Sequence, residues 1–125
     1  MPAVAIVGAS RDRSKFGNIA LRAYAENGYD VYPVNPKESE IEGHTAYASV
    51  ADIPVYLDRV SIYLPPDRAM AMLEELGDTH VGEIFLNPGS DTPAVLEKAH
   101  DLGLNAVCEC SIADLGLSPS EYAAK

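Results

Sequence analysis

Short apolar runs alternate with amphipathic segments along the chain, and this alternation limits the possible folds more than any other feature. Residues 3–7 form an uninterrupted apolar run that ends at Gly8, as is typical of a strand buried on both faces of a parallel sheet. The same pattern predicts further strands at residues 31–34, 60–64, 83–86 and 104–108, and helices at residues 17–27, 49–53, 67–76, 92–102 and after Ser118. Strand and helix thus alternate five times, which indicates a parallel sheet with right-handed crossovers.

Glycine and proline mark the ends of these predicted elements. Gly28, Gly77 and Gly103 follow helical segments, and Pro66 suits the first position of the helix after the third strand. The predicted fold is therefore α/β, a Rossmann-like doubly wound five-stranded parallel sheet in a three-layer α/β/α arrangement. With 125 residues, 47% of them hydrophobic, we expect a single domain over residues 1–125.

Ligands of doubly wound sheets bind outside the carboxyl ends of the strands, where the strand order reverses. Residues 8–17, 35–37, 64–68 and 87–90 form the predicted loops at that edge. The first loop is long, carries Arg11, Arg13 and Lys15, and opens a helix whose free amides favour an anion by about 0.3–1 kcal/mol per charge. Phosphate binding is the chemistry this loop favours, and a solvated surface loop with scattered charges is the alternative.

This first loop lacks the signatures of several other sites. A dinucleotide-binding fingerprint requires glycine where Ser10 and Arg13 stand, and a Walker A loop requires Gly-Lys after four intervening residues. A nucleophile elbow requires glycine at the position of Asp12, so Ser10 is a poor candidate nucleophile.

The second predicted strand ends in Asn35-Pro36-Lys37, and no acid follows until Glu38. NAD-binding folds place an acid at this position to hold the ribose hydroxyls, whereas a basic residue suits a phosphorylated ribose. The segment therefore favours a nucleotide with a ribose phosphate. A simple turn at Asn35-Pro36 is the alternative interpretation.

The charge of the chain is uneven. Its net charge is −10, yet residues 1–37 hold five basic and three acidic residues, so that residues 38–125 carry −12. This acidity argues against binding to nucleic acid or anionic membranes, which needs a basic face, but allows a local anion site in the N-terminal third. The acidic excess also resembles that of proteins adapted to high salt. Without a leader pattern or a run of 18 apolar residues, we expect a cytoplasmic protein that is not bound to membranes.

Four motifs in the N-terminal half occur together in a known family. They are Val4-Ala5-Ile6-Val7-Gly8-Ala9-Ser10, Lys15-Phe16-Gly17, Gly28-Tyr29-Asp30-Val31-Tyr32-Pro33-Val34-Asn35-Pro36 and Glu40-Ile41-Glu42-Gly43. With these motifs the chain resembles the small CoA-binding domain proteins, which are similar to the N-terminal CoA-binding domain of the succinyl-CoA synthetase α subunit. The resemblance spans about residues 3–112, and residues 58–66, 87–89 and 99–107 fit it less tightly.

This resemblance implies that the chain binds coenzyme A or an acyl-CoA. The residues that would hold the CoA phosphates are Gly8, Ala9, Ser10, Lys15, Phe16 and Gly17. Those that would border the adenosine and its 3′-phosphate are Val34, Asn35, Pro36 and Lys37, while Leu64, Pro65 and Arg68 would close the adenine side. The two basic clusters agree with this assignment, because CoA carries a pyrophosphate and a separate 3′-phosphate.

The chain departs from this family at two places. Phe85-Leu86-Asn87 stands where the family shows Trp-x-Gln, and Glu109-Cys110-Ser111-Ile112 replaces Asp/Asn-Arg-Cys-Ile. Cys108 and Cys110 are separated by a single residue, so a disulfide between them would be strained. We expect two buried, inert thiols, and a mixed disulfide between Cys110 and CoA is the alternative.

No catalytic or metal-binding set is evident from the sequence. His44, His80 and His100 are dispersed, and the two cysteines lack further metal ligands at suitable spacing. The related synthetases act through a phosphorylated histidine and an ATP-binding domain, neither of which we find in these 125 residues. The sequence therefore favours a non-catalytic CoA-binding or regulatory module, with a homodimer as one arrangement for a small open sheet. An NAD(P)-binding oxidoreductase or redox sensor, and an interaction module with a vestigial pocket, are the alternatives.

Overall fold

The computed structural model describes residues 2–77, 81–108 and 112. Its main sheet has five parallel strands in the order β2-β1-β5-β6-β7. The strands are β1 Ala3–Val7, β2 Asp30–Val34, β5 Leu57–Ile62, β6 Val81–Leu86 and β7 Ala106–Val107. The helices are α1 Phe16–Glu26, the 3-10 helix η1 Val50–Asp52, α2 Pro66–Leu76 and α3 Pro93–Asp101. The predicted Rossmann-like, doubly wound α/β fold is confirmed.

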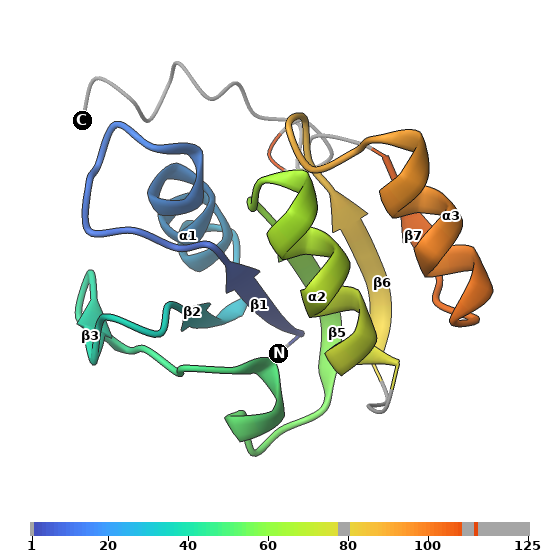
Figure 1. Ribbon diagram of the computed structural model, residues 1–125. Helices are drawn as coiled ribbons and strands as arrows, with labels where there is room; N and C mark the ends of the chain where they lie inside the picture. The colour runs from blue at the N-terminus through green and yellow to red at the C-terminus, as the bar shows by residue number, and fades with distance from the viewer. Residues whose placement is uncertain (1, 78–80, 109–111, 113–125) are drawn as a thin grey trace.

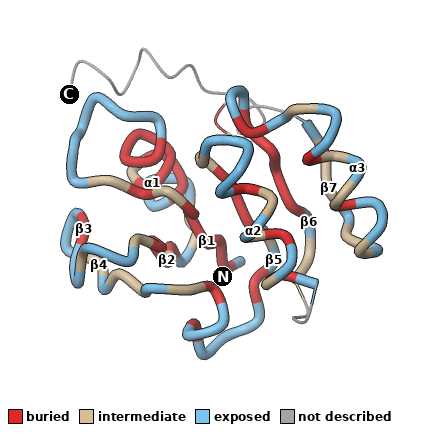
Figure 2. The backbone as a smooth tube through the Cα atoms, viewed as in Figure 1, coloured by how far each residue is buried: buried red, intermediate tan, exposed pale blue. Residues whose placement is uncertain are grey.

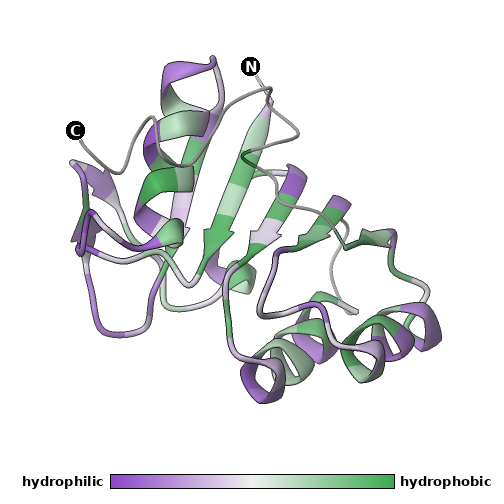
Figure 3. Cartoon of the chain, turned by 90° about the horizontal axis from the view of Figure 1, so that it is seen from above, coloured by the Kyte–Doolittle hydropathy of each residue, from purple (hydrophilic) through white to green (hydrophobic). Residues whose placement is uncertain are grey.

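Helices cover both faces of the sheet, as Figure 1 and the view turned by 90° in Figure 3 show. Alternate residues of the fully buried strand β1 belong to two separate cores: Ala5 and Val7 pack with α2 and α3, while Val4 and Ile6 pack with α1. Figure 2 shows buried residues along β1 and α1 and in the later parts of β5 and β6. The uninterrupted apolar run of β1 is thus explained by its burial on both faces. Within the described residues, no helix is long and apolar enough to cross a membrane.

The strand order reverses between β1 and β5. Helix α1 carries the chain from β1 outward to β2, whereas α2 carries it from β5 to β6 on the other side of the sheet. The loops that follow β1 and β5 therefore diverge to opposite faces. Such divergence opens a crevice at the carboxyl ends of these two strands, which is where doubly wound sheets bind ligands.

Element ends differ from the sequence predictions at a few places. The third strand of the sheet is Leu57–Ile62 rather than residues 60–64, and the last strand comprises only Ala106–Val107 rather than residues 104–108. After Ile62 the chain leaves the ladder, since both backbone polar groups of Leu64 bond to the Ser90 hydroxyl instead of a neighbouring strand. The predicted helix after Ser118 lies outside the described residues.

A small hairpin was not predicted from the sequence. Strands β3 Glu40–Ile41 and β4 His44–Thr45 pair antiparallel across a two-residue turn. Both turn residues have positive φ, 50° at Glu42 and 80° at Gly43, as a primed hairpin turn requires. Two-residue strands carry no usable periodicity, and glutamate is not a residue typical of that turn, so the sequence held little signal for this element.

Candidate functional site

A cleft of about 1270 Å³ opens at the reversal point of the strand order, between the loop after β1, the end of β2 and one face of α2. All of the site residues predicted from the sequence line it, namely residues 8–10, 15–17, 34–37, 64, 65 and 68. The structure thus brings together three segments that are far apart in the sequence. The loop after β6 completes the wall with Pro88, Gly89 and Ser90.

Two glycines hold the loop after β1 close to its neighbours. Gly8 has a φ of +89°, and a Cβ atom there would overlap the carbonyl oxygen of Tyr63 at the end of β5. A Cβ atom at Gly17, in the first turn of α1, would overlap the carbonyl oxygen of Gly8. Glycine is therefore required at both positions, because only the missing side chain lets the helix start pack directly on the end of β1.

The N-terminus of α1 is open toward the cleft. Lys15 is the N-cap residue, and its side chain makes no capping hydrogen bond. Its carbonyl oxygen accepts from the amides of Asn18 at 3.1 Å and Ile19 at 3.0 Å. Among the described residues, no group accepts a hydrogen bond from the backbone amide of Phe16 or Gly17. These two donors therefore remain available to an anion in the cleft.

Hydrogen bonds within the loop after β1 give it a defined shape. The Asp12 carboxylate accepts from the Ser14 amide at 3.0 Å and from the Ser14 hydroxyl at 2.7 Å. These bonds lower the pKa of Asp12, first through the hydroxyl and then through the amide. The Ser10 hydroxyl oxygen accepts from the Asp12 amide at 3.0 Å, which leaves its hydrogen free to be donated to a ligand oxygen.

Asn18, which was not predicted as a site residue, anchors this loop to α1. Its side chain is fully buried, and its amide nitrogen donates to the Ser10 carbonyl oxygen at 2.8 Å and to Glu42 at 3.2 Å. The Asn18 amide oxygen accepts from Arg22 at 2.7 Å. A buried amide with all of these bonds satisfied keeps the loop and the β3–β4 hairpin in a fixed relation.

The basic residues of the loop do not all face the cleft. Arg11 pairs with Glu38 at 3.4 Å, and Arg13 pairs with Glu42 at 3.7 Å. Neither arginine lines the cleft. The segment around the β3–β4 hairpin therefore neutralises two of the three positive charges that the sequence had suggested for an anion site.

Three other cations do line the cleft, namely Lys15, Lys37 and Arg68. Within the described residues, no carboxylate lies within 4.0 Å of their charged nitrogens. All three side chains belong to exposed residues, so they can reorient toward a bound anion. The cleft consequently combines the open end of α1 with three positive charges that have no carboxylate partner in the part of the chain that the structure describes.

Asn35 acts mainly as a structural residue at the edge of the cleft. Its side-chain nitrogen donates to the Ala9 carbonyl oxygen at 2.9 Å, and its side-chain oxygen accepts from the Lys37 amide at 2.8 Å. The turn interpretation of Asn35-Pro36 is therefore correct in its local geometry. That turn also sets the backbone of Lys37 beside the loop after β1.

A buried polar cluster fixes the opposite wall. Ser61, Asn87 and Ser90 are at most 1% exposed. The Asn87 side chain donates to the Ser61 hydroxyl at 2.9 Å and to the Ile62 carbonyl oxygen at 3.0 Å. The Ser90 hydroxyl accepts from the Leu64 amide at 3.0 Å and donates to the Leu64 carbonyl oxygen. This hydroxyl replaces a strand neighbour for Leu64 and so positions the loop between β5 and α2.

Several cleft residues were missing from the sequence prediction. Ala71, Met72 and Glu75 lie on α2, and Ala48 lies on the segment that precedes η1. The three helical residues follow Arg68 at intervals of three, four and seven, so the periodicity of the predicted helix could have identified them. Ala48 carried no comparable signal.

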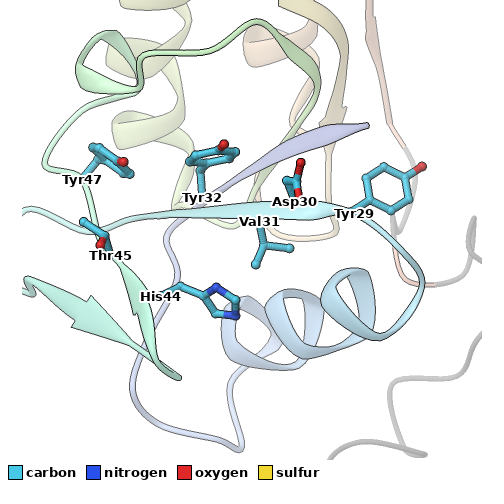
Figure 4. Close-up of a pocket in the computed structure, with 7 residues that line it drawn as sticks. All are labelled: Tyr29, Asp30, Val31, Tyr32, His44, Thr45 and Tyr47. Carbon is cyan, nitrogen blue, oxygen red and sulfur yellow. The ribbon is translucent and has the colours of Figure 1, made fainter. Parts of the chain in front are cut away.

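A second pocket, of about 300 Å³, lies at the outer edge of β2. Figure 4 shows its lining residues as sticks, and Tyr32 and Tyr47 lie on one side of the strand while Val31 and His44 lie on the other. The Tyr32 and Tyr47 rings are 6.1 Å apart between centroids. These side chains do not converge on a common point, so the pocket has no arrangement suited to catalysis.

Cys108 follows β7 and is exposed, which makes the prediction of two buried thiols wrong for this residue. The prediction failed because β7 ends at Val107, so Cys108 does not lie in the sheet. Partial desolvation of the sulfur and, second, the Asp91 carboxylate raise the pKa of the Cys108 thiol. A raised pKa lowers the thiolate fraction at neutral pH. Cys110 and His80 lie outside the described residues.

Fold and cleft together define a doubly wound α/β domain with a basic cleft at its switch point. A model of the CoA binding domain family matches residues 2–115, and the chain belongs to that family. The resemblance predicted from the sequence motifs is thereby confirmed.

Relatives and solved structures agree with this assignment. The chain is 31% identical over 115 residues to the alpha subunit of acetate–CoA ligase (ADP-forming) II from Pyrococcus furiosus, covering 83% of the chain and 25% of that subunit. It is 34% identical over 87 residues to acetate–CoA ligase (ADP-forming) from Methanocaldococcus jannaschii, of which it covers 12%. The chain thus spans a quarter or less of these two relatives.

Two solved structures show the same fold. A conserved hypothetical protein from Pyrococcus furiosus superposes with a TM-score of 0.79 at 29% identity, covering 85% of this chain and 91% of that chain. The dinucleotide-forming acetyl-coenzyme A synthetase 1 of Ca. Korarchaeum cryptofilum superposes with a TM-score of 0.75 at 28% identity, covering 86% of this chain and 26% of that chain.

Proposed function

We propose that this chain binds coenzyme A or an acyl-CoA in the cleft at the switch point, as a non-catalytic binding or regulatory module. The observation that carries the proposal is the pairing of two separate anion sites in one cleft. Lys15 lies at the open N-terminus of α1, and Lys37 lies at the end of β2, each without a carboxylate partner among the described residues. CoA presents a pyrophosphate and a 3′-phosphate, one for each site.

The positions of the remaining site residues support this assignment. The Phe16 and Gly17 amides and the Ser10 hydroxyl would donate to the pyrophosphate, next to the Lys15 ammonium group. Lys37 would hold the 3′-phosphate, while Leu64, Pro65 and Arg68 close the adenine side. Phe16 is 56% exposed at this cleft, which suits an apolar contact made only when the ligand is present.

A nicotinamide dinucleotide is the competing ligand for such a cleft. The end of β2 offers Lys37 rather than an acid, and the Asn35 side chain is engaged with Ala9 and with the Lys37 amide. No group at this position is thus arranged to hold the two ribose hydroxyls of NAD. A redox role for Cys108 is also disfavoured, because its raised pKa reduces its reactivity.

Isothermal titration of the full chain with CoA, NAD and NADP tests this proposal. We expect CoA to bind and to raise the melting temperature of the protein, with NAD and NADP binding at least tenfold more weakly. The Gly8→Ala variant is not a suitable control, since it disturbs the packing on Tyr63. Lys15→Ala changes only an exposed side chain and should weaken CoA binding. Binding of a nicotinamide cofactor without binding of CoA would contradict the proposal.

A further inference from the structure

One face of α2 lines the cleft along most of the helix. Arg68, Ala71, Met72 and Glu75 line the cleft from this helix, and their spacing places them on one side of it. A rise of 1.5 Å per residue separates Arg68 from Glu75 by about 10 Å along the axis. Because α2 begins with Pro66 at the carboxyl edge of the sheet and Glu75 is its penultimate residue, Glu75 lies at the end of the cleft farthest from that edge, which we call the inner end.

Glu75 is the one acidic residue among those that the structure places around the cleft. One of its carboxylate oxygens accepts from the Ala51 amide of η1 at 3.3 Å. This bond ties the side chain to the segment opposite α2, where Ala48 lines the cleft. Among the described residues the other carboxylate oxygen has no such anchor, and it is free to accept a hydrogen bond from a ligand.

The surroundings of Glu75 suit a flat ring that carries an amine. Ala48, Ala71 and Met72 present small or polarizable apolar surfaces on the two sides of the inner cleft, and a methionine sulfur packs well against aromatic rings. A carboxylate at the inner end accepts hydrogen bonds but donates none. Negative charge at this end also keeps phosphates at the Lys15 and Lys37 end, so a bound nucleotide has a defined direction.

We propose that Glu75 recognises the exocyclic amine of adenine and makes the cleft selective for adenine over 6-oxopurines. This inference rests on the proposed function, because it assumes that the phosphates of CoA occupy the Lys15 and Lys37 sites. The adenine ring then lies between Ala48 and the Ala71–Met72 face of α2, one helical turn beyond Arg68, which together with Leu64 and Pro65 closes the side toward the carboxyl edge. A 6-oxopurine has a carbonyl oxygen in place of this amine. The Glu75 carboxylate repels that oxygen, because both groups are hydrogen-bond acceptors.

Glu74 provides a matched control on the same helix. It does not line the cleft, and its carboxylate pairs with Lys98 of α3 at 2.8 Å on the outer side. Glu74→Gln and Glu75→Gln are the same chemical change at adjacent positions. Glutamine at position 75 keeps an oxygen for the Ala51 amide, so the variant retains the contact with η1.

The experiment compares the binding of CoA and of its hypoxanthine analogue by isothermal titration, for the unaltered protein and both variants. We expect the unaltered protein and Glu74→Gln to bind CoA about tenfold more tightly than the hypoxanthine analogue. A tenfold difference in affinity is at the low end of what a hydrogen bond to a charged acceptor contributes. Glu75→Gln should lose the preference for CoA or reverse it, because its oxygen stays on the Ala51 amide and the remaining NH2 group donates to the 6-oxo group but cannot accept from the 6-amine.

Each outcome decides between the two proposals. Equal binding of both ligands to the unaltered protein overturns the role of Glu75 while leaving CoA binding intact. An unchanged preference in Glu75→Gln overturns it as well, since the selectivity then arises elsewhere. Failure of CoA to bind the unaltered protein overturns the proposed function and this inference together. Should Glu75→Gln not fold, equal binding of the two ligands to the unaltered protein still refutes the role of Glu75.

Discussion

Replacing Lys37 with alanine removes one positive charge from the wall of the cleft without disturbing the turn that carries it. The bond that orders this turn runs from the Lys37 amide to the Asn35 side chain at 2.8 Å, and alanine keeps that amide. Lys37 is exposed, so the water-like limit of Coulomb's law applies. At 4 Å each pair of unit charges then contributes about 1 kcal/mol.

A phosphomonoester carries a charge of about −1.5 to −2 at neutral pH. Its interaction with Lys37 is therefore worth about 1.5–2 kcal/mol at low ionic strength, which corresponds to a roughly 10- to 30-fold change in affinity. We expect the unaltered protein to prefer CoA over dephospho-CoA by this factor. Lys37→Ala should bind the two ligands within about twofold, and added salt should reduce the preference of the unaltered protein.

The assay is a cycle of four titrations, with CoA and dephospho-CoA against the unaltered protein and Lys37→Ala. Arg11→Ala is the matched control, because it removes the same charge from an exposed side chain that pairs with Glu38 at 3.4 Å outside the cleft. The control should keep the preference for CoA. If Lys37→Ala retains the full preference, or Arg11→Ala loses it to the same extent, the 3′-phosphate does not bind at Lys37.

Three further predictions concern packing, pH and salt. Gly17→Ala should lower the free energy of unfolding, measured with urea, by about 1–3 kcal/mol and abolish CoA binding. The reason is that the Cβ atom of the new alanine overlaps the Gly8 carbonyl oxygen. A variant with normal stability and normal CoA binding would contradict this prediction. Lys98 lowers the pKa of Glu74, so the pair stabilises the folded protein fully at neutral pH and loses this contribution as the pH falls below about 4. The free energy of unfolding of Glu74→Gln should therefore depend less on pH in this acid range. An acid unfolding profile identical to that of the unaltered protein would exclude the effect. With a net charge of −10, the melting temperature should rise steeply between low and molar KCl as self-repulsion is screened; a flat response would refute salt adaptation.

Local sequence signals predicted most of the fold. Strand β1 was predicted with the bounds that the structure shows, because burial on both faces demands an unbroken apolar run. Helix α2 was also predicted closely, with Pro66 at its first position and Gly77 directly after its last residue. The β3–β4 hairpin and the early end of β5 were missed, since they depend on a positive φ at Glu42 and on the Ser90 hydroxyl.

The sequence by itself determined the order of strands and helices, the loops at the carboxyl edge and the motifs that identify the family, since these depend on neighbours within a few residues. Tertiary structure alone decided how the charges are used. It pairs Arg11 and Arg13 with acids beyond Lys37, and it leaves Lys15 and Lys37 facing one cleft. Pairing between charges depends on distance in space, and the chain crosses the sheet between these residues, so their spacing in the sequence carries no record of it.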